Sequence, residues 1–274
     1  MIQTLNQHDL ASNYALSEET IRGYREKGHA VLRSLLSPEE ISEFRPIITS
    51  AADRFNVETR PLEERDTYGK AFLQIMNLWV RDEQVRRYTL ARRFAKAAAE
   101  LMGVPAVRLY HDQALFKEPG GGPTPWHQDQ FYWPLDTSNA ITLWMPLVDI
   151  PAEVGGMVFG SGSHKLGYIG ELAISDTSDA VLGDLIERQG IPKESYGAMS
   201  AGDATFHSGW TLHSAPGNPT SQMREVMTVI YFADGTSTFE PRNEEQKSDL
   251  AGWLPGIQPG ELAASPLNPI VYSV

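Results

Sequence analysis

The most informative segment of this sequence is Pro125-Trp126-His127-Gln128-Asp129-Gln130. If it is extended, His127 and Asp129 point to the same side of a strand, because side chains alternate with a period of two. An imidazole and a carboxylate then converge on one point. A further histidine from a distant strand would complete a two-histidine, one-carboxylate face, the ligand set of non-haem iron oxygenases. The spacing alone occurs by chance in many proteins, so its meaning depends on its surroundings.

His213 and Arg224 supply that context. Arg224 opens an apolar segment, residues 225–232, which is predicted to be a strand. A turn at residues 216–219 is expected to fold this strand back beside the His213 segment. The guanidinium would then face the interior of a barrel and bind a carboxylate through two parallel hydrogen bonds. A buried arginine needs such an anionic partner.

The first hundred residues have mainly helical patterns. Residues 1–16 are expected to form a loose or docking arm. A helix capped by Ser17 should end at Gly28, and a second, with Ser37 as its cap and Pro38 in the first position, should run towards Phe55. The remaining expectations in this part are a long loop at 56–80 and one helix at 83–102.

From Val104 onward the pattern changes to short strands and turns. The predicted strands lie at 107–116, 140–147, 157–159, 204–206 and 225–232, and a helical insertion lies at 178–189. Helices followed by many short strands indicate an α+β protein with a mainly β core, either a sandwich or a barrel.

Composition narrows the chemistry further. The chain has 274 residues, 41% of them hydrophobic and 21% charged, as in soluble globular proteins. It has no cysteine, so a metal would be bound by His, Asp or Glu. The net charge of −12 argues against nucleic acids and anionic membranes as partners. No signal peptide or membrane-spanning run is evident, so a cytoplasmic location is expected.

Taken together, these segments resemble the phytanoyl-CoA dioxygenase family of iron(II)- and 2-oxoglutarate-dependent oxygenases. The resemblance covers nearly the whole chain, including residues 18–36. It is carried by Gly120-Gly121-Gly122 before residues 126–130, then 143–149, 155–157 and 160–165, and finally by His213 with Arg224.

The resemblance implies a double-stranded β-helix, also called a jelly roll and similar to that of cupins, with flanking N-terminal helices. It implies a single domain over residues 1–274, with a mostly helical flank at 1–103 and the jelly-roll core at 104–274. Iron(II), 2-oxoglutarate and O2 would be the cofactor and co-substrates.

Site residues follow from the same resemblance, position by position. His127, Asp129 and His213 match the iron ligands, and Arg224 matches the arginine that pairs with the distal carboxylate of 2-oxoglutarate. Two further positions match residues near the co-substrate, Gln113 and Trp144. Trp144 is equally well explained as an aromatic residue of the core.

Other histidines compete for these roles. His207 is a rival for the third ligand position, but the spacing between His213 and Arg224 favours His213, and His207 is then expected to line the pocket. His164 is assigned to the structure of a Gly/Ser loop. His111 adjoins an aspartate that must point to the opposite face, so it is not a predicted ligand.

The function implied is oxidation, most simply hydroxylation, of a small and largely apolar organic molecule, such as a natural-product intermediate, with release of succinate and CO2. Phe131 and Trp133 would share the face of the ligands if the strand stays regular, and Tyr68 and Phe72 would lie on a lid formed by residues 56–80. Two alternatives stay open: a cupin-like metalloenzyme that does not use 2-oxoglutarate, and a non-enzymatic sandwich domain that binds a small ligand. The sequence does not determine the oligomeric state.

Overall fold

A computed structural model describes residues 10–152, 154 and 156–274. Residues 1–9 of the predicted arm, His8 among them, and Gly155 lie outside the described residues. The helices of the described part are α1 (Glu18–Lys27), α2 (Pro38–Phe55), α3 (Thr67–Ala71), α4 (Leu78–Arg81), α5 (Glu83–Thr89), α6 (Arg92–Met102), α7 (Asp176–Gln189) and α8 (Glu244–Trp253), with 3-10 turns η1 (Leu62–Glu64), η2 (Asp129–Tyr132) and η3 (Ser163–Leu166).

The strands are antiparallel and form two sheets. The larger sheet has the order β1-β8-β5-β10-β3-β11, and β2 also pairs with β3. Its strands are β1 (His29–Leu32), β2 (Leu73–Met76), β3 (Ala106–Lys117), β5 (Ala140–Pro146), β8 (Ala204–Ser208), β10 (Arg224–Ala233) and β11 (Ile270–Ser273). The smaller sheet has the order β4-β9-β6-β7, made of β4 (Thr124–His127), β9 (His213–Ala215), β6 (Val158–Gly160) and β7 (Lys193–Ser195).

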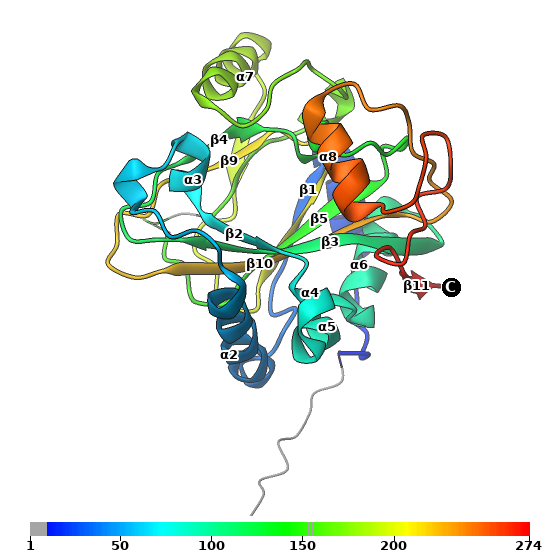
Figure 1. The fold of residues 1–274 in the computed structure, drawn as a ribbon, viewed down its shortest axis with the longest axis horizontal. Helices are drawn as coiled ribbons and strands as arrows, with labels where there is room; N and C mark the ends of the chain where they lie inside the picture. Colours follow the sequence, from blue (N-terminus) through cyan, green and yellow to red (C-terminus); the bar gives the residue numbers. More distant parts are fainter. Residues whose placement is uncertain (1–9, 153, 155) are drawn as a thin grey trace, which may run out of the picture.

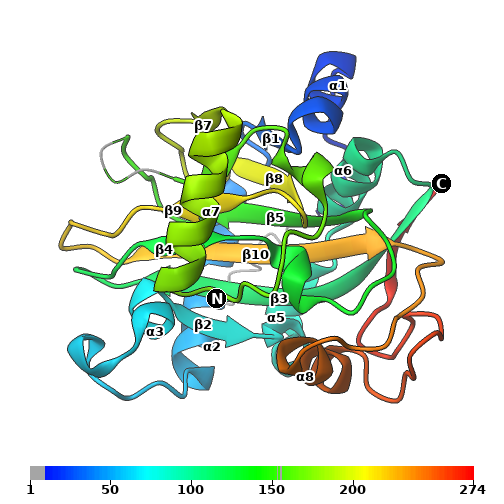
Figure 2. The ribbon, with the colours of Figure 1, turned by 90° about the horizontal axis from the view of Figure 1, so that it is seen from above.

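Two sheets that face each other in this way form the predicted jelly roll. Figure 1 shows α2, α4 and α5 below the large sheet and α3, α7 and α8 on its other side. Seen from above, α7 lies across β4 and β9 (Figure 2) and packs on β4 through Leu182, Ile186 and Trp126. The mainly β core with flanking helices agrees with the sequence prediction.

The alternation along β10 explains why this strand is buried on both faces. Met227, Val229 and Tyr231 belong to the large core under the helices. Ile230 and Phe232 face the other way, into a second apolar cluster inside the barrel. Burial of both faces matches the almost continuous apolar pattern of residues 225–232.

The N-terminal helix boundaries agree with the capping signals. Ser17 accepts a hydrogen bond from the backbone N–H of Thr20, and Gly28 ends α1 with a φ of 84°. Ser37 and Glu40 form a capping box at the start of α2. These local signals are reliable because each satisfies a backbone group that the helix leaves unpaired.

Two expectations for the N-terminal part were wrong. Residues 56–80 are not one long loop, because they contain η1, α3, β2 and α4. The predicted helix at 83–102 is divided at residues 90–91 into α5 and α6. The chain turns there because the backbone N–H of Arg93 donates to the carbonyl of Leu10, and its buried guanidinium pairs with Glu40. These contacts override a helix-favouring sequence.

Candidate metal and co-substrate site

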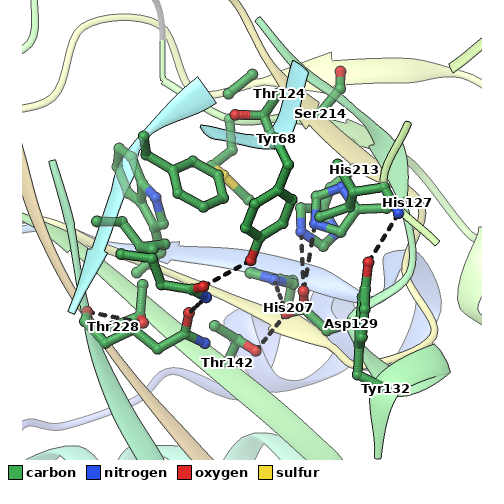
Figure 3. Close-up of a pocket in the computed structure, with 18 of the residues that line it drawn as sticks. Tyr68, Thr124, His127, Asp129, Tyr132, Thr142, His207, His213, Ser214 and Thr228 are labelled. Atoms are coloured by element: carbon green, nitrogen blue, oxygen red, sulfur yellow. Dashed lines mark hydrogen bonds and ion pairs between the residues drawn. The ribbon is translucent and has the colours of Figure 1, made fainter. Parts of the chain in front are cut away.

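The register of the small sheet brings two histidines together. His127 ends β4, His213 begins β9, and the two residues stand directly opposite each other across the antiparallel pair. Their ring centroids are 4.0 Å apart. Together with Asp129 they offer three ligand atoms that all lie within 4.8 Å of one another. Figure 3 shows the three side chains converging on one side of the pocket.

The protonation of both rings suits a metal. Nδ1 of His127 lies 2.8 Å from the carbonyl oxygen of Pro125, and Nδ1 of His213 lies 2.9 Å from that of Thr211. A carbonyl oxygen only accepts, so Nδ1 must donate in each ring. The lone pair of a neutral imidazole is then on Nε2, the atom that faces Asp129. Burial lowers the pKa of His213 well below its usual value and so favours the neutral ring.

The two oxygens of the Asp129 carboxylate have different neighbours. Its Oδ1 lies 3.5 Å from Nε2 of both His127 and His213. Its Oδ2 accepts hydrogen bonds from Thr142 Oγ1 at 2.7 Å and from His207 Nε2 at 3.1 Å. His207 therefore lines the pocket and orients the acid.

Asp129 reaches its position in a different way from the one predicted. The strand ends at His127, and Asp129 begins the 3-10 turn η2, so the period of two is lost. Trp133 lines the pocket as expected, and Tyr132 lines it too. Phe131 does not line it: the residue is buried against Tyr132, so the expectation for Phe131 was wrong.

Arg224 lies in the same pocket, at the start of β10. Its side chain is buried, and its Nε and Nη1 have no hydrogen-bond partner among the described residues. Its guanidinium carbon is 5.8 Å from the centre of the Trp144 ring, which also lines the pocket. Burial lowers the pKa of Arg224 to about 10. Unpaired donors of a buried cation are the arrangement that a carboxylate of a ligand would complete.

The predicted neighbourhood of Arg224 was wrong in one respect. β10 does not fold back beside the His213 strand, because β9 belongs to the small sheet and β10 to the large one. The segment at 216–223 crosses from one sheet to the other. Arg224 and His213 therefore face each other from opposite walls of the barrel, which leaves room for a ligand between them.

The segment at 67–76 forms another wall. Tyr68 and Phe72 line the pocket, as predicted, with ring centroids 5.2 Å apart. Tyr68 donates to Gln74 Oε1 at 2.8 Å, and Gln74 Nε2 donates to Gln113 Oε1 at 2.6 Å. Gln113, predicted near the co-substrate, is thus held in the pocket by a chain of hydrogen bonds that begins on α3.

A half-buried acid lies at the other end of the pocket. Asp249 on α8 accepts hydrogen bonds from Tyr110 at 2.9 Å and from Trp253 Nε1 at 3.1 Å. Burial raises the pKa of Asp249 to about 7. His111 lines the pocket nearby, and its buried Nδ1 has no partner among the described residues. Its neighbour Asp112 points to the opposite face, as predicted.

The sequence of residues 24–226 matches the model of the family described as phytanoyl-CoA dioxygenase. The chain belongs to the phytanoyl-CoA dioxygenase family. It is 29% identical over 149 residues to methylphosphonate hydroxylase of Gimesia maris, an alignment that spans 54% of each chain, about half the length of that relative.

Solved structures of two relatives match the fold over most of its length. The 2-oxoglutarate-dependent carbocyclase SnoK from nogalamycin biosynthesis is 27% identical, with a TM-score of 0.77, covering 94% of this chain and 97% of that one. The epimerase SnoN, solved with Fe3+, 2-oxoglutarate and nogalamycin RO, is 25% identical, with a TM-score of 0.74, covering 93% and 98%.

This chain is therefore an enzyme of the 2-oxoglutarate-dependent non-haem iron oxygenases. The residues present fit both groups that this class requires. Two neutral imidazoles and one carboxylate are an iron(II) ligand set, and the unpaired guanidinium atoms of Arg224 suit the second carboxylate of 2-oxoglutarate.

Several pocket residues were not predicted from the sequence. Thr142 and Thr124 are hydroxyl groups without a motif, and Asp249 lies in a mainly polar segment without a clear apolar stripe. A signal did exist for Lys117, which is buried behind Thr124, because it continues the alternation of residues 111, 113 and 115 along the predicted strand. His164 packs against Gly28 in the loop structure assigned to it.

No helix in the described part of the chain is long and apolar enough to cross a membrane. The cytoplasmic location stays a prediction.

Proposed function

We propose that His127, Asp129 and His213 bind the iron, that Arg224 anchors 2-oxoglutarate, and that the enzyme hydroxylates a small, largely apolar molecule. The single observation that carries this proposal is the pairing of the three converging ligand atoms with the unpaired guanidinium of Arg224 in one pocket. The same buried cation argues against a cupin-like enzyme that does not use 2-oxoglutarate and against a simple binding domain, because neither needs a buried arginine.

The residues around the site divide the work. Bound iron, 2-oxoglutarate and O2 supply an oxidant able to remove hydrogen from a C–H bond, with release of succinate and CO2. Thr142 and His207 fix one oxygen of Asp129, so that its other oxygen stays aimed at the two histidines. Arg224 orients the co-substrate, and Trp144 beneath its guanidinium limits water at that end.

The substrate end of the pocket favours a neutral or weakly basic molecule. Tyr68, Phe72, Tyr132 and Trp133 supply aromatic walls to the pocket. Among the described residues that line the pocket, Arg224 is the only lysine or arginine, so nothing there would bind the phosphates of coenzyme A.

Asp249 supports the same choice. A carboxyl group at the substrate end repels a second carboxylate, a phosphonate or a phosphate, and it attracts a hydroxyl or an amine. This distinguishes the proposed substrate from the one named for methylphosphonate hydroxylase. The two nogalamycin enzymes also support a natural-product substrate, since one comes from nogalamycin biosynthesis and the other was solved with nogalamycin RO.

The pocket encloses about 190 Å³. Ligand sites are often about 300–1,000 Å³, so this volume suits the co-substrate together with the reacting end of a substrate. A larger scaffold would extend out of the pocket, whose lining includes Tyr68 of α3 and Asp249 of α8.

The test is succinate release by the iron(II)-loaded protein with 2-oxoglutarate, and its stimulation by free acids, their coenzyme A esters and polycyclic natural-product scaffolds. We expect basal release, strongest stimulation by a neutral scaffold, and hydroxylated product. Asp129→Ala should reduce both metal content and turnover to background. Normal turnover in Asp129→Ala or in His213→Ala would refute the ligand assignment, and a clear preference for a coenzyme A ester would refute the substrate class alone.

A further inference from the structure

The inner face of the barrel continues beyond Arg224 to a second buried cation. In the β3–β10 pair, Gln113 stands opposite Thr228 and Lys117 stands opposite Arg224. Residues two apart on a strand share a face, so Lys117 is on the pocket side with Gln113. Directly opposed residues of an antiparallel pair have Cβ atoms about 5 Å apart, which makes Lys117 and Arg224 immediate neighbours.

The side chain of Lys117 is fully buried. Its ammonium donates to the carbonyl of Gly122, in the Gly-rich loop, and to Thr124 Oγ1 at 3.3 Å. Thr124 lines the same pocket as Arg224, so one hydroxyl group separates the ammonium from the ligand space. The loop closes tightly over the lysine, because a Cβ at Gly121 would stand 2.9 Å from the Lys117 Cγ.

The charges at this end of the pocket do not balance. Neither Lys117 nor Arg224 has a carboxylate partner among residues 10–152, 154 and 156–274. The nearest acid in sequence, Glu118, is turned away and pairs with Arg65. Burial, and then the neighbouring Arg224, lower the pKa of Lys117 to about 7. Two adjacent buried cations without an anion are unfavourable, and an anionic ligand would relieve that repulsion.

We propose that Lys117, acting with Thr124, is a second cationic group of the 2-oxoglutarate site and stabilises the distal carboxylate that Arg224 holds. The proposal rests on the proposed function, because it requires that 2-oxoglutarate binds beside Arg224. Lys117 is a positioning residue: its ammonium donates to the Thr124 oxygen, which leaves the Thr124 hydroxyl hydrogen free to point at the carboxylate.

A purely structural role is the alternative, in which Lys117 only ties down the Gly-rich loop through Gly122. Two substitutions separate the readings. Lys117→Gln keeps a donor for the Gly122 carbonyl but removes the charge, and Lys117→Met removes both. Replacement of a buried charge by an apolar group of similar size is often tolerated, so both variants should fold.

The experiment measures binding under anaerobic conditions to the iron(II)-loaded protein, by calorimetry, for 2-oxoglutarate and for pyruvate. Pyruvate has the metal-chelating 2-oxo acid group but no distal carboxylate. For both Lys117 variants we expect the Kd for 2-oxoglutarate to rise about 10- to 100-fold, as for loss of a charged hydrogen-bonding partner. The Kd for pyruvate should not change, and the exposed Lys165→Met should behave as the native protein does.

A second measurement uses the native protein alone. At about pH 8, above the pKa of Lys117, 2-oxoglutarate binding should take up protons while pyruvate binding should not. Comparison of the binding heat in phosphate and in Tris reports this uptake. Arg224 is the charged group that faces Lys117 from β10, and it stays protonated throughout this range.

Each outcome of these measurements supports or overturns the proposal. Native affinity in Lys117→Gln but not in Lys117→Met would overturn the proposal in favour of loop anchoring, and unchanged affinity in both would overturn it outright. If either variant does not fold, the absence of proton uptake by the native protein overturns it. If the native protein binds 2-oxoglutarate no more tightly than pyruvate, it is the anchoring role of Arg224 that fails.

Discussion

The two ends of the pocket are built from different kinds of structure. At the co-substrate end, Lys117, Thr124 and Arg224 come from β3, β4 and β10, which the ladders of the two sheets hold in register. At the other end, Asp249 comes from α8, outside the barrel, and accepts a hydrogen bond from Tyr110. The five-residue helix α3, which carries Tyr68, also lies outside the barrel, but it adjoins the Gly-rich loop, where the backbone N–H of Gly122 donates to the Lys70 carbonyl. Figure 1 shows these helices on the same side of the large sheet.

This difference explains how one reaction can be applied to many substrates. Residues in a sheet cannot move without breaking several hydrogen bonds, so the strand-built end keeps the metal and the co-substrate in a fixed geometry. Short helices and connecting segments tolerate change far better. We therefore expect substitutions at the strand-built end to affect metal and 2-oxoglutarate binding, and those at the helix-built end to affect which molecule is oxidised.

Arg224→Leu should give the largest effect that can be measured as an affinity. The distal carboxylate would stay buried without its partner, at a cost of about 2–5 kcal/mol, or about 30-fold or more in the Kd for 2-oxoglutarate. Iron binding should be unaffected. Arg224→Lys should also be impaired, because an ammonium cannot reproduce the planar fork. Unchanged 2-oxoglutarate affinity in the leucine variant would remove Arg224 from the site.

Thr142→Val should weaken iron binding rather than 2-oxoglutarate binding. Without its hydroxyl group, Asp129 loses the shorter of the two hydrogen bonds to Oδ2. Groups that orient a ligand in this way contribute about 10- to 100-fold to metal affinity. Thr205→Val is a matched control one strand away, because the buried hydroxyl of Thr205 has no partner among the described residues. Equal iron affinity in the two variants would contradict the role given to Thr142.

The sequence predicted the strand-built end better than the helix-built end, for a physical reason. Arg224, Gln113 and the three ligands lie on or beside strands whose apolar alternation is visible in the sequence. Tyr68 and Phe72 line the pocket, but their segment was expected to be a loop. Helices of four or five residues, such as α3 and α4, depend on tertiary contacts and carry little pattern of their own.

Phe131 shows where periodicity stops being informative. His127 and Asp129 do converge, but the convergence comes from a turn that starts at Asp129. The sequence contains no Gly or Pro at that turn to announce it, so a regular strand was the simplest expectation. The place of β10 also depends on tertiary structure, because no local signal at 216–223 indicates that the chain changes sheets.

Phe72→Ala and Phe131→Ala make the same change at a wall residue and at a core residue. Phe72 lines the pocket, so its loss should uncouple the reaction: product formed per succinate should fall on the order of tenfold. Phe131→Ala should cost about 3–5 kcal/mol of folding stability and leave coupling intact in the folded fraction. Measured coupling and thermal unfolding should therefore separate the two variants, and the reverse pattern would show that the pocket wall is misassigned.

Asp249→Asn is expected to change stability rather than activity, and its effect appears in the pH dependence of stability. The folded-state pKa of Asp249 is about 7, against 3.8 for an exposed aspartate, so the folded protein binds the proton more tightly than the unfolded chain. Stability must then fall as pH rises from about 4 to about 7 and level off above that range.

The asparagine of the variant carries no such proton. It still accepts from Tyr110 but offers one acceptor fewer to Trp253, which is a constant cost of about 1 kcal/mol. The raised pKa of Asp112 and the lowered pKa of His111 shift stability equally in both proteins, so they cancel in the difference. Urea unfolding at several pH values should show the variant gaining on the native protein as pH rises. Parallel curves would mean that Asp249 is charged at neutral pH and already paired, and the helix-built end would then favour an amine over a hydroxyl group.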